Sequence, residues 1–80
     1  MEVIINRFDQ NETHKNIGFT VRSGENIFVI NKEIELSETK THDEYVAEAY
    51  ALCQPGINEW LNSISMLGKK LNPESNTFEE

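Results

Sequence analysis

The feature that most constrains this chain is a seven-residue repeat of apolar positions across its C-terminal half. The steps between these positions alternate between four and three residues, which is the spacing of an apolar stripe along one face of an α-helix. A helix with such a stripe must bury it against another surface. We call these eight positions the helix seam: Val46, Tyr50, Cys53, Ile57, Trp60, Ile64, Leu67 and Leu71.

Local signals mark both ends of this helix. Thr41 and Glu44 form a capping-box pattern, in which each side chain accepts a hydrogen bond from the backbone of the other residue. The pair Lys69-Lys70 suits the negative end of a helix, and Pro73 should stop it. We therefore expect a helix over about 42–70.

The pair Pro55-Gly56 interrupts this pattern and allows two interpretations. An interior proline costs ~3 kcal/mol and a glycine ~1 kcal/mol relative to alanine, so the pair could divide the segment into a helix-turn-helix. However, the seam keeps its phase across the pair, and Gln54 is a poor N-cap for a second helix. Pro55 also falls opposite the seam, where a lost hydrogen bond lets a helix curve. We favour one helix kinked near Pro55.

The N-terminal half has the pattern of β-strands. The opening EVIINRF is rich in β-branched residues, and the polar stretch DQNETHKN after it is typical of a loop. Ile17, Phe19 and Val21 then alternate with small or polar residues, which indicates a strand with one buried face.

A turn follows this strand. Gly24 in Ser23-Gly24-Glu25 can adopt a positive φ, so the segments on either side should form an antiparallel hairpin. The alternation continues through 26–36 with Lys32 as an intrusion. This stretch is either one long strand or two short strands that turn at Asn31-Lys32.

Together these elements predict an α+β fold: a small antiparallel β-sheet of about three strands from the N-terminal half, packed against a long C-terminal amphipathic helix. A single domain should span 1–71, and 72–80 should form a flexible acidic tail. We expect the core to consist of Val3, Ile5, Ile17, Phe19, Val21, Phe28, Ile30, Ile34, Val46, Tyr50, Cys53 and Ile57.

The apolar stripe is long for a sheet of this size. A single helix over 42–70 would be ~43 Å long, whereas a seven-residue strand spans only ~23 Å. Apolar side chains left uncovered mark an interaction site or an aggregation hazard. We expect the C-terminal part of the stripe, which we call the distal seam, to contact a partner, most simply a second copy in a homodimer. The side chains concerned are Trp60, Ile64, Met66, Leu67 and Leu71.

Acidic residues are concentrated in one third of the chain. The net charge is −7, and residues 33–59 carry seven of the fourteen acidic side chains but a single basic one, Lys40. This charge argues against direct nucleic-acid binding, which depends on Lys and Arg. It either keeps the chain soluble or steers it onto a protein with a basic surface. The candidate contact residues are Glu33, Glu35, Glu38, Asp43, Glu44, Glu48 and Glu59.

Catalytic and metal-binding patterns are absent from the sequence. Cys53 falls on the seam, where a buried, unreactive thiol is expected, and only His14 and His42 could serve it as a base. Residues 9–20 begin like a calcium loop, but His14 stands where glycine is needed and Thr20 where a bidentate Glu is needed. We therefore expect no enzyme activity, no catalytic residues, no metal and no cofactor.

The cellular context is inferred from what the chain lacks. It has no signal-peptide pattern and no apolar run long enough to span a membrane, and a single cysteine suits the reducing cytoplasm. Our leading hypothesis is a protein-binding module, such as a phage or mobile-element accessory protein, that inhibits a basic, nucleic-acid-handling host protein. The alternative is a structural subunit that self-assembles through the distal seam.

Overall fold

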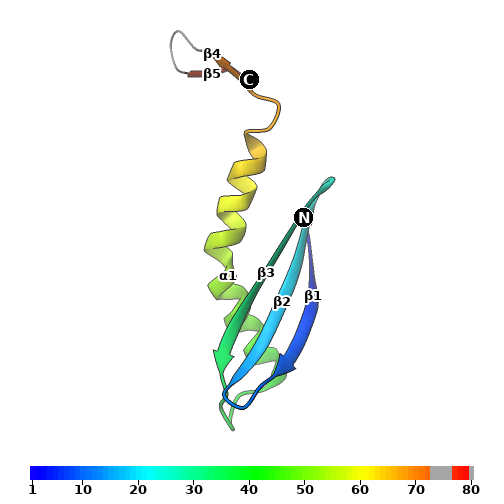
Figure 1. The fold of residues 1–80 in the computed structure, drawn as a ribbon, viewed down its shortest axis with the longest axis vertical. Coiled ribbons are helices and arrows are strands. Elements are labelled where there is room, and N and C mark those ends of the chain that lie inside the picture. Colours follow the sequence, from blue (N-terminus) through cyan, green and yellow to red (C-terminus); the bar gives the residue numbers. More distant parts are fainter. Residues whose placement is uncertain (73–76, 80) are drawn as a thin grey trace.

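A computed structural model of the chain describes residues 1–72 and 77–79, which form a three-stranded antiparallel sheet, one helix and a short two-stranded hairpin. The α+β fold expected from the sequence is therefore confirmed. Figure 1 shows the helix beside the sheet, with the short hairpin beyond its far end. The elements are β1 (Glu2–Gln10), β2 (His14–Ser23), β3 (Asn26–Glu35), α1 (His42–Ser65), β4 (Lys70–Asn72) and β5 (Thr77–Glu79).

The main sheet has the order β1-β2-β3, so β2 is central and both other strands are edges. Gly24 has a φ of 61° in the turn between β2 and β3, as its position in the sequence predicted. Strand β3 is continuous, which confirms one long strand over two short ones. Lys32 lies opposite Ile17, on the face that packs against α1, and stays exposed. A lysine at an edge can lay its stem on apolar surface and keep its ammonium in water.

Strand β1 contains a β-bulge that lies against a glycine in β2. Ile5 lies opposite Phe19, but Arg7 lies opposite Gly18, so Asn6 is an extra residue in β1. A Cβ on Gly18 would lie 2.3 Å from Asn6 Oδ1 and 3.0 Å from Arg7 Cβ, so a larger residue would displace the side chain of Asn6. Bulges and charged side chains are features that protect an edge strand from pairing with other chains.

Helix α1 runs without a break through Pro55, which confirms the single-helix interpretation. The capping box forms as predicted: Glu44 N–H donates to Thr41 Oγ1, and Thr41 N–H donates to Glu44 Oε1. Pro55 is exposed, so the backbone position that lacks its hydrogen bond faces water. The kink near Pro55 remains a prediction.

The helix ends earlier than the sequence suggested. Its last residue is Ser65, and the N–H groups of Met66 and Leu67 bond to carbonyls three residues back, which closes the final turn. Gly68 then adopts a φ of 84°, and the chain leaves the helical path. The expected helix end near residue 70 was therefore wrong: the helix ends at Ser65, and a glycine with positive φ follows the turn after it.

Two further expectations about the C-terminal end of the helix were also wrong. The last turn of α1 holds no basic residue, so Lys69 and Lys70 do not sit at its negative end. Leu71 belongs to β4. This strand pairs with β5, which lies inside the segment expected to be a tail. Leu71 is therefore not part of a helical seam. The division between a domain at 1–71 and a tail at 72–80 remains a prediction.

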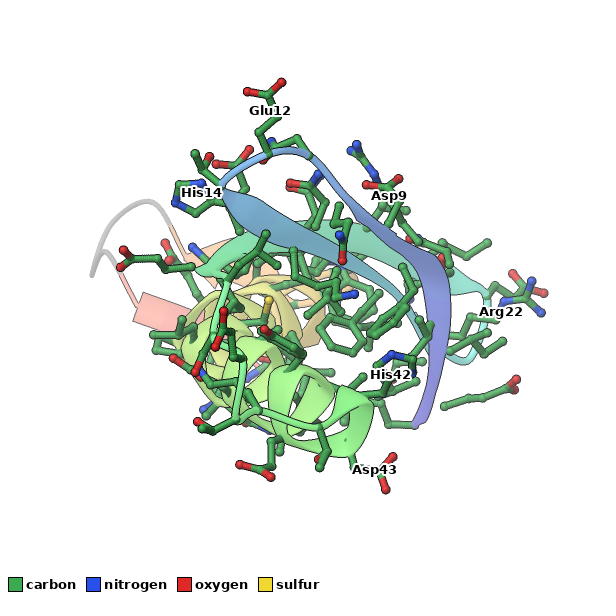
Figure 2. The ribbon with its side chains drawn as sticks, turned by 90° about the horizontal axis from the view of Figure 1, so that it is seen from below. Asp9, Glu12, His14, Arg22, His42 and Asp43 are labelled. Atoms are coloured by element: carbon green, nitrogen blue, oxygen red, sulfur yellow. The ribbon has the colours of Figure 1, made fainter. Side chains whose placement is uncertain are left out.

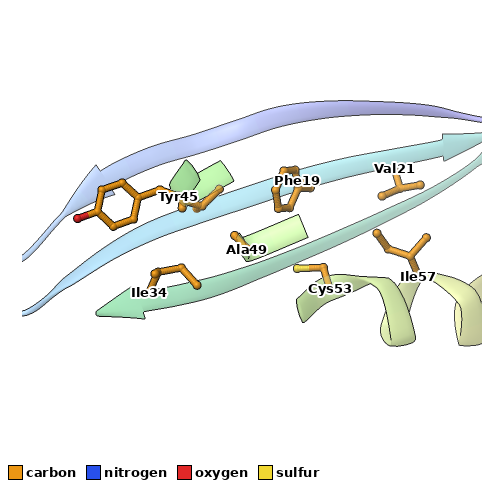
Figure 3. Packing of buried hydrophobic residues seen from close by; sticks show 8 residues of the cluster. Phe19, Val21, Ile34, Tyr45, Ala49, Cys53 and Ile57 are labelled. Atoms are coloured by element: carbon orange, nitrogen blue, oxygen red, sulfur yellow. The ribbon is translucent and has the colours of Figure 1, made fainter. Parts of the chain in front are cut away.

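The core lies between α1 and the two strands β2 and β3 (Figure 3). Its fully buried residues are Ile17, Phe19, Val21, Ile34, Tyr45, Ala49, Cys53 and Ile57. Six of these were predicted, but Tyr45 and Ala49 were not, because the buried face of α1 follows every fourth residue from 45 to 57 rather than the centre of the seam. Val46 and Tyr50 lie at the border of this face and are half-buried.

The expected burial of β1 was also wrong. Val3 and Ile5 are 36% and 48% exposed, although both point to the same side of the sheet as Val21 and Phe19, their neighbours in β2. Helix α1 packs against β2 and β3, so β1 extends beyond the surface that the helix covers (Figure 1). Phe28 and Ile30, on β3, are half-buried under the helix.

Candidate interaction surfaces

The acidic residues of β3 point away from the helix. Glu33 and Glu35 flank the buried Ile34, so their side chains lie on the outer face of the sheet. Asn16 lies between Glu33 and Asp9 in the paired strands, which brings Asp9 to the same face. Asp9 was not among the candidate residues, and only the pairing of β1 with β2 reveals that it belongs there. We call Asp9, Glu33 and Glu35 the outer acidic face.

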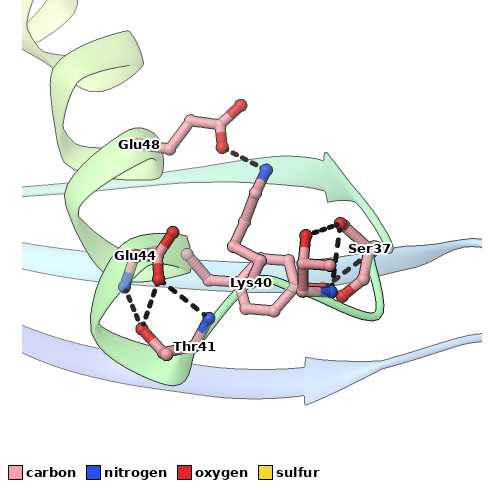
Figure 4. A network of polar contacts seen from close by, with 7 residues as sticks. Ser37, Lys40, Thr41, Glu44 and Glu48 are labelled. Atoms are coloured by element: carbon pink, nitrogen blue, oxygen red, sulfur yellow. Dashed lines mark hydrogen bonds and ion pairs between the residues drawn. The ribbon is translucent and has the colours of Figure 1, made fainter.

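The acidic residues at the start of α1 have roles within the fold (Figure 4). Glu44 Oε1 accepts hydrogen bonds from the backbone and the hydroxyl of Thr41. Glu48 accepts a hydrogen bond from Lys40 Nζ, and this contact raises the pKa of Lys40. These two carboxylates therefore hold the entry to the helix in place.

The other candidate acidic residues are dispersed. Asp43 borders an apolar hollow between β1 and α1, Glu38 borders a different hollow at the end of the sheet, and Glu59 lies beside Trp60 on α1. Figure 2 shows Asp43 and Asp9 on opposite sides of the molecule. The seven residues thus form no single patch, and Glu33 and Glu35 are the two that lie together on the outer face of the sheet.

Ion pairs neutralise little of this charge. Within residues 1–69, whose side chains are described, the ion pairs are Arg7–Asp9 at 2.8 Å and Lys40–Glu48. Hydrogen bonds from Arg7 and Asn16 lower the pKa of Asp9, and the bond to Asp9 raises the pKa of Arg7. Of the seven candidate residues, Glu48 alone forms an ion pair in this part of the chain, and Arg7 also attracts Glu33 electrostatically.

The distal seam is covered only in part. The Trp60 ring stacks on Phe28 with centroids 5.3 Å apart and planes at 15°, and both residues are half-buried. Ile64 is also half-buried, whereas Met66 is 39% and Leu67 70% exposed. The side chain of Leu71 lies outside the described residues. Apolar exposure therefore increases towards and beyond the end of α1.

A hollow of about 400 Å³ lies between β1 and the first half of α1. Val3, Ile5 and Phe19 form one wall, and Val46 and Tyr50 form the other. The Phe19 and Tyr50 rings meet edge to face, with centroids 5.6 Å apart. The hollow exists because α1 covers β2 and β3 but leaves the β1 side of the sheet open.

The only cysteine has no catalytic geometry. Cys53 is 0% exposed, and burial raises the pKa of its thiol, so the sulfur stays protonated and unreactive near neutral pH. No metal-binding group of three or more His, Cys, Asp or Glu side chains occurs in the described part of the chain. In the same part of the chain, α1 does not contain enough apolar residues to cross a membrane.

In comparisons with known proteins, no family model, curated protein or solved structure matched this chain. The functional proposals below therefore rest on the surfaces of the molecule itself.

Proposed function

We propose that this protein is a non-enzymatic binding module that docks onto a basic protein through the outer acidic face. The supporting observation is that Glu33 and Glu35 share one exposed face and form no ion pair among the described side chains, although Arg7, which pairs with Asp9 on this face, also attracts Glu33 electrostatically. Unpaired surface charge of one sign accelerates association with an oppositely charged surface and disfavours other partners.

The class of partner follows from the same charge. Proteins that handle nucleic acids carry basic grooves that bind phosphates. A carboxylate-bearing face can occupy such a groove and exclude the nucleic acid without any chemistry. We therefore assign the module the role of a cytoplasmic inhibitor of a nucleic-acid-handling protein, of the kind encoded by phages and mobile elements.

The test is a pair of charge-matched variants. Glu33→Lys with Glu35→Lys reverses the outer acidic face, and Glu2→Lys with Glu25→Lys makes the same change in net charge near the other end of the sheet. We expect a basic protein captured by the parent chain to be lost with the first variant and retained with the second. The affinity of the captured basic protein for the purified parent chain should also fall steeply as the salt concentration rises. Equal capture by both variants would reject the proposal.

Glu44 and Glu48 are unsuitable for this test. Reversal of Glu44 breaks the capping box, and reversal of Glu48 places a cation beside Lys40. Loss of the cap alone costs ~1 kcal/mol, so lost binding by such a variant could reflect unfolding. Glu33 and Glu35 make no side-chain hydrogen bond within the described residues, which keeps stability and binding separable.

A second candidate function is self-assembly through the distal seam, and the exposure of Leu67 favours it. A second copy could cover Leu67 and Met66 with the same apolar surface. Leu67→Glu should then dissociate an oligomer in sedimentation equilibrium, whereas Leu52→Glu, which also alters an exposed leucine, should not. A parent chain that stays monomeric at micromolar concentration would rule this function out. Trp60 is not substituted in this test because its ring stacks on Phe28 within the same chain.

A further inference from the structure

A hollow with basic side chains lies at the end of the sheet, where the loop before α1 meets β1 and β2. Its volume is about 500 Å³. Two of the chain's seven Lys and Arg residues border it, together with the first residue of the helix. The residues that matter here are Gln10, Lys15, Glu38, Lys40, His42 and Tyr45.

Lys15 is the anomaly in this hollow. The residue is only 8% exposed, and a lysine is almost never buried without a charged partner. Its Nζ donates to the neutral Gln10 Oε1 at 2.9 Å and lies 4.8 Å from the centroid of the Phe8 ring and 5.4 Å from that of the Tyr45 ring. No carboxylate pairs with it among the described side chains. Its charge is therefore held by an amide and two aromatic rings, without a counter-ion.

A second ammonium group approaches the same ring. Lys40 Nζ lies 5.3 Å from the centroid of Tyr45, and its partner Glu48 is exposed to solvent. Tyr45 cannot easily move, because its hydroxyl donates to the Ser37 carbonyl and accepts from the Ser37 N–H, both at 2.9 Å. Two lysine side chains thus converge on one fixed ring.

The remaining groups set the local charge. His42 is the first residue of α1, where the helix dipole is positive, and its ring meets Phe8 edge to face at 5.1 Å. Figure 2 shows His42 between the helix and β1. Glu38 is the one carboxylate that borders the hollow. Glu48 pairs with Lys40 beside the hollow, so Lys15 is the cation there that has no carboxylate partner among the described side chains.

We propose that this hollow binds a small oxyanion, a phosphate or a carboxylate, with Lys15 Nζ as its principal contact and Lys40 Nζ as a second. A lysine ammonium has three donors, and Gln10 uses one of them. A bound oxyanion would accept another and supply the counter-charge that the buried lysine lacks. This site is separate from the outer acidic face and does not depend on its function.

The binding test is a titration followed by NMR. Inorganic phosphate and acetate are added in separate series, with sodium chloride used to hold the ionic strength constant. We expect saturable shifts of the backbone amides of Lys15, Lys40 and His42. Saturation in both series would support a general oxyanion site, and saturation in one would identify the preferred chemistry. Shifts that stay linear in both series would overturn the proposal.

A variant that retains the fold assigns binding to Lys15. Gln10→Glu places a carboxylate where the amide oxygen now accepts from Lys15, so the chain supplies its own counter-ion. We expect the oxyanion affinity to fall about tenfold. Gln54→Glu, on α1, adds the same charge away from the hollow and should leave the affinity nearly unchanged. A Gln10→Glu protein that binds as tightly as the parent would contradict the role of Lys15.

Glu38→Gln provides a change in the opposite direction. It removes the one carboxylate that borders the hollow, so it should tighten oxyanion binding severalfold. Glu25→Gln, in the turn between β2 and β3, removes the same charge far from the site and is the matched control. Identical affinities for these two variants would show that the hollow is not where the anion binds.

Discussion

Gly56 of α1 packs so closely against Ile30 of β3 that a Cβ on Gly56 would lie 2.9 Å from Ile30 Cδ1. Its neighbour Pro55 is exposed to solvent. The two residues that resemble a helix break in the sequence thus have different roles in the fold. The glycine allows α1 to approach the sheet, and the proline faces solvent, where its missing hydrogen bond is tolerated.

Gly56→Ala should change the free energy of unfolding by less than about 1 kcal/mol, because two effects of opposite sign meet at this position. The added methyl group would crowd Ile30 Cδ1, but that atom is the free end of a side chain and can shift, whereas alanine is favoured over glycine in a helix by ~1 kcal/mol. Urea unfolding of Gly56→Ala, of Ile30→Val and of the double variant separates these effects. Ile30→Val removes the Cδ1 atom, so it should cost less stability in the Gly56→Ala protein than in the parent. Equal costs in the two backgrounds would show that Gly56 and Ile30 are not in close contact.

Pro55→Ala should stabilise the protein. The substitution restores an N–H group that can donate to the Ala51 carbonyl one turn earlier, and an interior proline costs ~3 kcal/mol relative to alanine. The larger entropy of the unfolded variant offsets about 0.4–1 kcal/mol of this gain. Thermal and urea unfolding measure the net change. A loss of stability would mean that the chain needs the proline to shape α1.

Tyr45→Phe should lower the free energy of unfolding by about 0.5–1.5 kcal/mol, since it removes both hydrogen bonds between the Tyr45 hydroxyl and the backbone of Ser37. The loop before α1 should also loosen. Hydrogen exchange of the Ser37 amide should become faster, while exchange in the centre of β2 changes only with global stability. Unchanged exchange at Ser37 would show that the Tyr45 hydroxyl does not fasten the loop.

Cys53 makes stability depend on pH in the alkaline range. Burial raises the pKa of its thiol above the ordinary value of 9.0, so the unfolded chain loses this proton at a lower pH than the folded chain. Stability is therefore unaffected by this group at neutral pH and falls as pH rises above its unfolded pKa. Cys53→Ala should be less stable at neutral pH because of the cavity, but its stability should fall less steeply above pH 9. Parallel pH profiles for the two proteins would contradict this effect.

The strands of the main sheet and the helix were predictable because their signals are local. The Thr41–Glu44 capping box lies within four residues, the alternation at Ile17, Phe19 and Val21 needs no partner strand, and the phase of the seam identified one helix. Which face of α1 is buried was less predictable. The seam pointed to Val46 and Tyr50, but Tyr45 and Ala49 contact the core more fully, because the position of the sheet sets the rotation of the helix.

The candidate surfaces depended on long-range pairing, which no local pattern reveals. Composition located the acidic segment, but the register between strands places Asp9 across Asn16 from Glu33 and assigns both to the outer face. The burial of Lys15 was also unforeseen, because its two rings come from Phe8 and from Tyr45, distant residues in the sequence. The early end at Ser65 and the positive φ of Gly68 after it were also not indicated by the seam.

The central claim is that α1 continues through Pro55 and lies along β3, since this arrangement exposes the outer acidic face on one side and covers the core on the other. Nuclear Overhauser effects in the 80-residue chain test it most directly. We expect contacts between the Ile30 δ1 methyl group and the Gly56 α protons, and between the Phe28 and Trp60 rings. Absence of these contacts, with non-helical chemical shifts at residues 54–56, would contradict it.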